Sequence, residues 1–287
     1  MDWGRVPGIN SLIHQFIADG KQTIFRKDCK IYYEAQQTGS RDMTIISISQ
    51  SMYFPWLGHF ELMRLSDVYF HYDDVQLSRG FYQRVQVITN GNSDYMSVSI
   101  ANKKQKQLVS SSILNGDKNW AIKHRNKLKA SLSKARYFQD SIQIFDSVHG
   151  ENHKFLHSIN RSSINKILNY LNLPKKISVQ DANGVNSAYA GSKRLLSICK
   201  DFGAKIYLTG HGALNYLDHE LFEKNQIEVH YVKYRFSHYS NLNPHYSPYV
   251  TALDPIAYLG SSITNSMQSD MVYWKEALRA RGDLRAK

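Results

Sequence analysis

Residues 50–60, "QSMYFPWLGHF", carry the residue types of a ligand-binding loop. They follow the apolar run at 45–48, and a plain connecting turn would be polar. A glycine in such a loop lets a ligand approach the backbone, and a histidine at the start of the next helix adds a hydrogen-bond donor for a phosphate. The alternative is that the aromatic side chains plug the edge of a sheet, with His59 as a core or surface histidine. We predict a ligand loop, with His59 as a catalytic candidate and these substrate-binding candidates: Gln50, Tyr53, Trp56 and Gly58.

A pair of carboxylates, Asp73-Asp74, follows the strand-like stretch "DVYFHY" at 67–72. One carboxylate could orient or deprotonate an amine, or the pair could hold Mg²⁺ on phosphates. The alternative is that Asp74 caps a turn. We predict that Asp73 or Asp74 acts in catalysis. Polar side chains that follow could bind substrate, the arginines as bidentate partners of phosphate: Gln76, Arg79 and Arg84.

A second candidate loop, "YLTGHGALNYLD", follows another strand at 205–208. It offers Gly210 as a binding residue and His211 as a second acid or base. The alternative is a tight strand-to-helix turn that needs a positive φ. In the tyrosine-rich stretch 231–258 most aromatic side chains are expected in an irregular core, and Tyr239 and Asp254 are the binding candidates; Asp254 is also a possible helix cap.

Three histidines, His149, His153 and His157, are spaced by four residues, which would align them on a helix. Gly150 interrupts that helix, and no zinc signature accompanies the spacing. We therefore predict no metal site there.

The elements that position these residues alternate between strands and helices. We predict strands at 44–49, 67–72, 177–179, 205–208 and 227–231, helices at 57–66, 119–134, 152–171 and 193–202, and a hairpin of 84–89 with 95–100 around Asn90-Gly91-Asn92. A strand, a helix and a strand in succession imply parallel pairing. The sequence predicts an α/β fold with a mostly parallel sheet.

The charge is concentrated in one segment. Of the net charge of +12, residues 101–136 contribute ten Lys and Arg side chains against Asp117 alone. Such a segment attracts an anionic partner, or is simply a solvated helix face. The chain has no apolar stretch long enough to span a membrane and no evident secretory signal, and Cys29 and Cys199 stand alone, so we expect a cytoplasmic protein.

The sequence resembles the WbqC-like proteins of bacterial surface-polysaccharide gene clusters. The resemblance covers about 43–260 and rests on the following motifs: "QSMYFPWLGHFELM", "SDVYFHYDDVQLSRGFYQR", "GAKIYLTGHGALNYLD" and "YSNLNPHYSPYVTALDPIAYLG". It implies a role in O-antigen or lipopolysaccharide biosynthesis, where some members are suggested to transfer glycine to an amino sugar. We expect a single α/β domain at 43–287 with a helical insertion around 101–172, preceded by an extension at 1–42.

The stretch "MYFPWLGHFELMRLSDVYFHYDDVQ" also resembles the first βα unit of adenylate-forming nucleotidyltransferases, most closely pantothenate synthetase. That resemblance implies an acyl-adenylate that an amine attacks to give an amide, and hence ATP; with Mg²⁺ held on its phosphates by the Asp73-Asp74 pair, the expected cofactors are ATP and Mg²⁺. The expected function is N-acylation of a nucleotide-linked amino sugar with an aminoacyl group such as glycine, with the diphosphate bound near the basic segment. Two alternatives remain: an aminoacyl-tRNA as the donor, and a non-catalytic module that binds RNA or polysaccharide.

Overall fold

The computed structural model describes residues 44–77, 80, 82–235, 239 and 247–282. These residues belong to a compact unit that runs from Met43 to Lys287. The predicted extension at 1–42, Cys29 and Arg79 lie outside the described residues.

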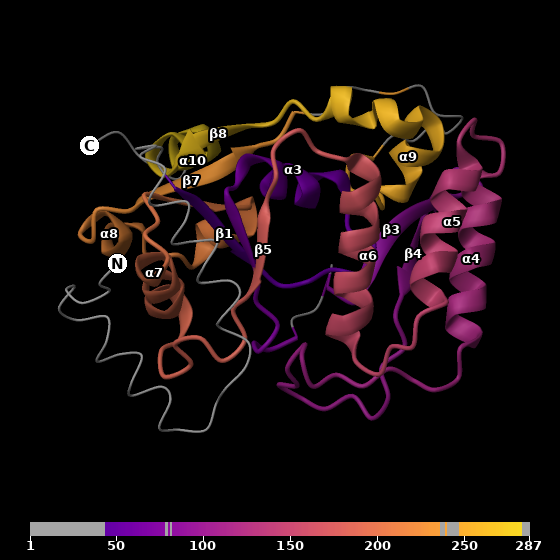
Figure 1. Cartoon of the computed structure of the whole chain (residues 1–287), viewed down its shortest axis with the longest axis horizontal. Coiled ribbons are helices and arrows are strands. Elements are labelled where there is room, and N and C mark those ends of the chain that lie inside the picture. The colour runs from indigo at the N-terminus through magenta and orange to yellow at the C-terminus, as the bar shows by residue number, and fades with distance from the viewer. Residues whose placement is uncertain (1–43, 78–79, 81, 236–238, 240–246, 283–287) are drawn as a thin grey trace, which may run out of the picture. The chain divides into compact units, whose positions relative to one another are not determined.

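A six-stranded sheet forms the centre of this unit, with the strand order β5-β2-β1-β6-β7-β8 (Figure 1). The first five of these strands are parallel, and β8 pairs antiparallel with β7. The predicted mostly parallel α/β fold is therefore confirmed. The strands are β1 (Ile45–Ser49), β2 (Val68–His71), β5 (Ser178–Asp181), β6 (Ile206–Thr209), β7 (Glu228–Lys233) and β8 (Asp270–Tyr273).

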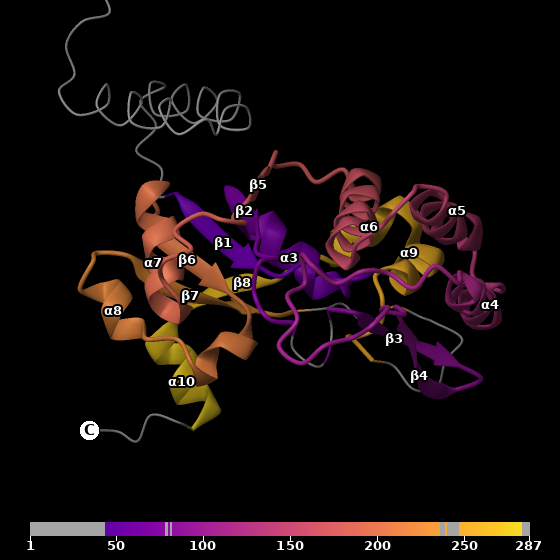
Figure 2. The ribbon, with the colours of Figure 1, turned by 90° about the horizontal axis from the view of Figure 1, so that it is seen from below.

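Helices cover both faces of the sheet because the chain reverses its direction of travel across it. It moves from β1 outward to β2 and β5, then returns to the other side of β1 for β6 and β7. Right-handed crossovers therefore place the helices of the outward path on one face and those of the return path on the other, as Figures 1 and 2 show. One face carries α3 (Leu57–Leu65) and α6 (Leu156–Leu171), and the other carries α7 (Gly191–Asp201), α8 (His219–Glu223) and α10 (Trp274–Arg281).

Strand β1 illustrates why the sheet is buried on both sides. Ile46 and Ile48 point into the core beneath α7, while Ile45 packs in the core on the other face. Ser47 shares that second face, where its hydroxyl is within 2.5 Å of the Ser66 hydroxyl. The strand order reverses between β1 and β6, and such a switch point is where open α/β sheets bind ligands.

The insertion between β2 and β5 contains a hairpin and three helices. The hairpin joins β3 (Arg84–Thr89) to β4 (Asn92–Ser97), followed by α4 (Asn119–Leu132), α5 (Phe138–His149) and α6. We expected the second strand from Tyr95, but it begins at Asn92. Asn90 and Gly91 both have positive φ, at 52° and 77°, so the turn needs only these two residues.

Several elements differ from the prediction. Helix α5 was not predicted, and the helix expected at 152–171 begins at Leu156. Helix α9 (Leu253–Leu259) begins one residue before Asp254, which therefore does not cap it. The last strand and helix, β8 and α10, were also missed. None of the helices in the described ranges has both the length and the apolar character needed to cross a bilayer.

Candidate functional site

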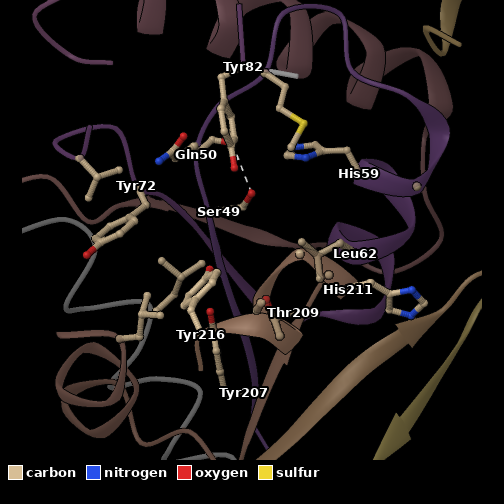
Figure 3. Close-up of a pocket in the computed structure, with 18 of the residues that line it drawn as sticks. Ser49, Gln50, His59, Leu62, Tyr72, Tyr82, Tyr207, Thr209, His211 and Tyr216 are labelled. Carbon is tan, nitrogen blue, oxygen red and sulfur yellow. Dashed lines mark hydrogen bonds between the residues drawn. The ribbon is translucent and has the colours of Figure 1, made fainter. Parts of the chain in front are cut away.

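A cavity of about 590 Å³ lies at the switch point, beyond the carboxyl ends of β1 and β6 (Figure 3). The loop that follows β1 forms one wall, together with the start of α3. The turn after β6, whose short helix η1 spans His211–Asn215, forms another, and the start of α7 closes a third side. The cavity is of the size that small-molecule sites have in proteins.

The two loops predicted from separate motifs meet in this cavity. The predicted residues that line it are Gln50, Trp56, Gly58, His59, Gly210 and His211. The parallel pairing of β1 with β6 explains this meeting, because the carboxyl ends of parallel neighbours lie at one edge of the sheet.

The other predicted residues in the described part of the chain do not line the cavity. Tyr239 and Asp254 bind one another, with the Tyr239 hydroxyl 2.6 Å from Oδ1 of Asp254. Arg84 lies over the ring of Tyr95 on the hairpin. Four further predicted residues also lie outside the lining of the cavity: Tyr53, Asp73, Asp74 and Gln76.

Gly58 serves the packing of Trp56. A Cβ atom at position 58 would lie 2.3–2.6 Å from atoms of the Trp56 indole, so only glycine leaves room for that ring. The indole in turn contacts Tyr234 and Tyr249, with ring centroids 4.8 and 5.2 Å away. Gly58 therefore shapes an aromatic wall of the cavity, a role that differs from the direct approach to a ligand that we expected.

We expect Gly58→Ala to lower the free energy of unfolding by about 1–3 kcal/mol, because the indole must leave its place between the two tyrosines. Urea unfolding measures this loss, and near-ultraviolet circular dichroism reports the displaced aromatic rings. Gly212→Ala is the matched control, since Gly212 also lines the cavity, has no positive φ and has open space where a Cβ would stand. Equal stability of the two variants would contradict this role for Gly58.

His59 lies at the start of α3, buried, with its Nε2 atom 3.1 Å from the Tyr69 hydroxyl. Burial lowers the pKa of His59 to about 4, so the ring is neutral near pH 7. A neutral ring can donate or accept a hydrogen bond but brings no positive charge to a phosphate.

The turn after β6 exposes His211, whose ring contacts that of Tyr234 at 5.3 Å between centroids. Gly210 has a φ of −87°, and Gly212 has no positive φ either. The alternative reading of this loop, a turn that needs positive φ, is therefore wrong. A Cβ at Gly210 would stand 3.3 Å from the Tyr234 hydroxyl, so a small residue is favoured there by close packing.

No Lys, Arg, Asp or Glu is among the described residues that line the cavity. An anionic group would instead meet backbone N–H groups. Helices α3 and α7 both begin at the cavity, with Gly58 and Gly191 in their first turns, and neither has an acidic residue there or a side-chain cap. Free N–H groups at a helix N-terminus favour phosphates. The expected placement of a diphosphate near the basic segment does not fit this cavity, because none of those ten cations lines it.

Further tyrosines line the cavity. Sequence reasoning missed Tyr72, Tyr82, Tyr207 and Tyr216. Tyr249 belongs to the stretch 231–258, where we expected most aromatic side chains in the core. Tyr216 is 65% exposed and Tyr249 is 52% exposed, which leaves ring surface available to a ligand. Tyr216 was within reach of a prediction, since it belongs to the quoted loop after β6.

Similarity to known proteins identifies the family of this chain. The model of the WbqC-like protein family matches residues 50–266. The chain belongs to this family. It is also 28% identical over 225 residues to "Uncharacterized protein Rv1507c" of Mycobacterium tuberculosis, an alignment that covers 76% of this chain and 95% of that protein. No solved structure matches the chain.

In this WbqC-like chain Asp73 holds loops together. The residue is fully buried, its Oδ1 accepts from the Ser51 N–H at 2.8 Å, and its Oδ2 lies 2.7 Å from Nε of Arg161. Arg161 also reaches Asp181 at 2.6 Å. The loop after β1, the end of β2 and helix α6 are thereby tied together.

Asp74 is engaged by a second arginine. Its Oδ2 accepts from Nη2 of Arg194 and from the Gly184 N–H, each at 2.7 Å. With both carboxylates committed to arginines, the pair does not fit the Mg²⁺ role that we considered. In the described part of the WbqC-like fold, no three or more His, Cys, Asp or Glu side chains are placed so that they could hold a metal ion. The histidines spaced by four residues are among the side chains to which this applies.

Tyr53 is fully buried on the side of the loop away from the cavity. Its hydroxyl lies 3.0 Å from Nδ1 of His124 and 2.8 Å from Nε2 of His149. Burial lowers the pKa of His124 to about 3 and that of His149 to about 4. This cluster links α4 and α5 to the loop between β1 and α3, and it gives Tyr53 a structural role.

Proposed function

We propose that the protein is a transferase that binds a nucleotide in the switch-point cavity and N-acylates a nucleotide-linked amino sugar with an aminoacyl group such as glycine. The observation that carries the proposal is the cavity itself. It joins tyrosine rings, which stack on bases and sugars, to helix N-termini that favour phosphates, at the ligand-binding edge of an open α/β sheet. Family membership supports a role in surface-polysaccharide biosynthesis.

The amide would form in two steps. The carboxylate of the amino acid attacks the α-phosphorus of ATP, and pyrophosphate leaves. The sugar amine then attacks the acyl carbon, AMP leaves, and the amine loses a proton as the amide forms. His211 is the proposed proton acceptor, since it is the exposed histidine of the cavity lining.

In this mechanism, backbone and side-chain groups of the cavity would bind the nucleotide and the sugar. Backbone N–H groups of α3 and α7 would hold the phosphates, and the neutral His59 would add a hydrogen bond without charge. Tyr216 and Tyr249 would stack on the base or the sugar ring.

The test is amino-acid-dependent exchange of labelled pyrophosphate into ATP, over a panel that includes glycine. We expect exchange with one amino acid, and Tyr216→Ala should raise the KM for ATP about tenfold because a stacking surface is lost. Tyr189→Ala is the matched control, since Tyr189 is 53% exposed and does not line the cavity. An equal rise in the KM for ATP in both variants would show that ATP does not bind in the cavity.

Absence of exchange with every amino acid would exclude free-amino-acid adenylation. Transfer from glycyl-tRNA to a UDP-linked amino sugar, monitored by mass spectrometry, then separates a different donor from a protein without transferase activity.

A further inference from the structure

We propose that helix α4 and the neighbouring β3–β4 hairpin form a binding surface for RNA with unpaired bases. This surface is distinct from the cavity, and the proposal stands whether or not the cavity has the function given above. Figures 1 and 2 place α4 beside the hairpin, at the end of the unit opposite to α7 and α8.

Most cations of residues 118–136, the segment that contains α4, lack acidic partners. Residues 118–136 contain seven Lys and Arg side chains and no Asp or Glu. Arg125 is paired with Asp146 and Lys127 with Asp94. The others are exposed, and no carboxylate of the described residues pairs with them: Lys118, Lys123, Lys129, Lys134 and Arg136.

Part of this charge weakens the helix, although Lys129 lies in the last turn, where the helix dipole favours a cation. Lys118 occupies the N-cap position, where the positive end of the helix dipole disfavours a cation, and the first turn has no acidic residue. Lys123 and Lys127, like Arg125 and Lys129, are like charges four residues apart, which also destabilises a helix. Helix stability therefore does not explain Lys118 and Lys123, and an anionic partner does.

The apolar face of α4 argues against a membrane as that partner. Leu128 and Leu132 are each 1% exposed, because they pack in the core of the unit. Ile122 is the large apolar side chain that the described part of α4 leaves exposed, at 59%. A helix that inserts into a bilayer surface needs a free apolar face, and this one has already buried its own.

An aromatic and guanidinium pair beside α4 favours nucleic acid. The guanidinium carbon of Arg84 lies 4.0 Å from the ring centroid of Tyr95, which is 38% exposed. Lys127 of α4 donates to the Tyr95 carbonyl oxygen at 2.9 Å, so the pair adjoins the basic helix. Unpaired RNA bases stack on aromatic rings and on guanidinium planes, while phosphates meet the lysines.

The test measures binding of a fluorescent single-stranded RNA to the full chain over a range of salt concentrations. If about five phosphates are neutralised, log K should fall with log salt with a slope of about −3.5. Lys123→Gln with Lys129→Gln should reduce the steepness of that slope by about 1.4. Lys200→Gln with Lys224→Gln removes the same charge from the exposed surface of α7 and its C-terminal neighbour α8, and should leave the slope unchanged.

Tyr95→Ala should weaken binding about tenfold with the salt slope retained, since the ring contributes stacking and no charge. Thermal unfolding verifies that each variant is folded. Equal effects of the two lysine pairs would overturn the proposal in favour of net charge alone. Tighter binding to vesicles of phosphatidylcholine and phosphatidylglycerol than to RNA would overturn it in favour of a membrane. Because RNA binding and pyrophosphate exchange are separate measurements, either can fail without the other.

Discussion

Arg161→Met should lower the free energy of unfolding by about 3–5 kcal/mol, the cost of removing one partner from a buried ion pair. The Asp73 side chain is fully buried, and Arg161 provides its positive charge at 2.7 Å. Methionine fills much of the volume of the arginine stem but leaves the carboxylate buried without a counter-charge. Urea unfolding followed by circular dichroism measures the loss.

Asp181, the second carboxylate that pairs with Arg161, provides the control. The Asp181 side chain is 46% exposed, so Asp181→Asn should cost less than about 1 kcal/mol although its contact with Arg161 is as short. Adding Asp73→Asn to Arg161→Met should restore part of the loss, because the uncompensated charge is then gone. A stability of Arg161→Met within about 1 kcal/mol of the unchanged chain would refute the structural role of Asp73 and reopen its catalytic one.

The second large effect is acid unfolding at a mild pH. Burial lowers the pKa of His59 and His149 to about 4 and that of His71 and His124 to about 3. The unfolded chain binds protons at these histidines below about pH 6.5, while the folded chain does not bind them until the pH reaches the lowered values. The stabilisation from these groups is therefore complete above pH 6.5 and is lost as the pH falls from there to 4 and below.

The expected slope is steep. Each histidine contributes about 1.4 kcal/mol per pH unit within that window, so that the four together contribute about 5.5 kcal/mol per pH unit. Burial also raises the pKa of Asp254 to about 6, and its protonation opposes the trend by one group at most. Since a domain is stable by about 5–15 kcal/mol, we expect unfolding between about pH 6 and 4.5.

A double variant isolates two of the four histidines. Asparagine can place an amide nitrogen near the position of Nδ1 and glutamine near that of Nε2, so His124→Asn with His149→Gln keeps hydrogen-bonding groups near the Tyr53 hydroxyl without a titrating ring. Urea unfolding at pH 7 and at pH 5.5 should show a smaller loss of stability in this variant. His211→Gln, at an exposed position, is the control and should retain the full loss; an unchanged pH dependence in both would refute the assignment.

The parallel sheet could be predicted from the sequence because most of its strands are short apolar runs, each joined to a helix with a recognisable end. Strand β8 could not, since one of its four residues is exposed, the other three are only half-buried, and the strand lies at the edge of the sheet after a polar turn. Helix α5 was not predicted because Asp, Gln and Ser interrupt its apolar positions. Where local pattern is weak, tertiary packing decides the element.

The part of the site that could be predicted is the part whose position follows from the order of the strands alone. The loops that carry His59 and His211 follow strands that proved to be parallel neighbours, so both reach the cavity. The surroundings of Asp73 were not predictable, because Arg161 lies 88 residues away in the sequence. The same holds for Tyr53, whose histidine partners come from helices far along the chain.

The strand order also determines when the sheet can form during synthesis. Strands β1 and β2 leave the ribosome early, yet Ile45 pairs with Ile206 and Val68 pairs with Ser178. Until those later residues emerge, both edges of the first βαβ unit stay open, with apolar side chains on each face. Contacts between distant parts of a chain form slowly, and exposed edges attract other chains. The nascent chain therefore exposes an edge that can pair with other chains until β6 has been made.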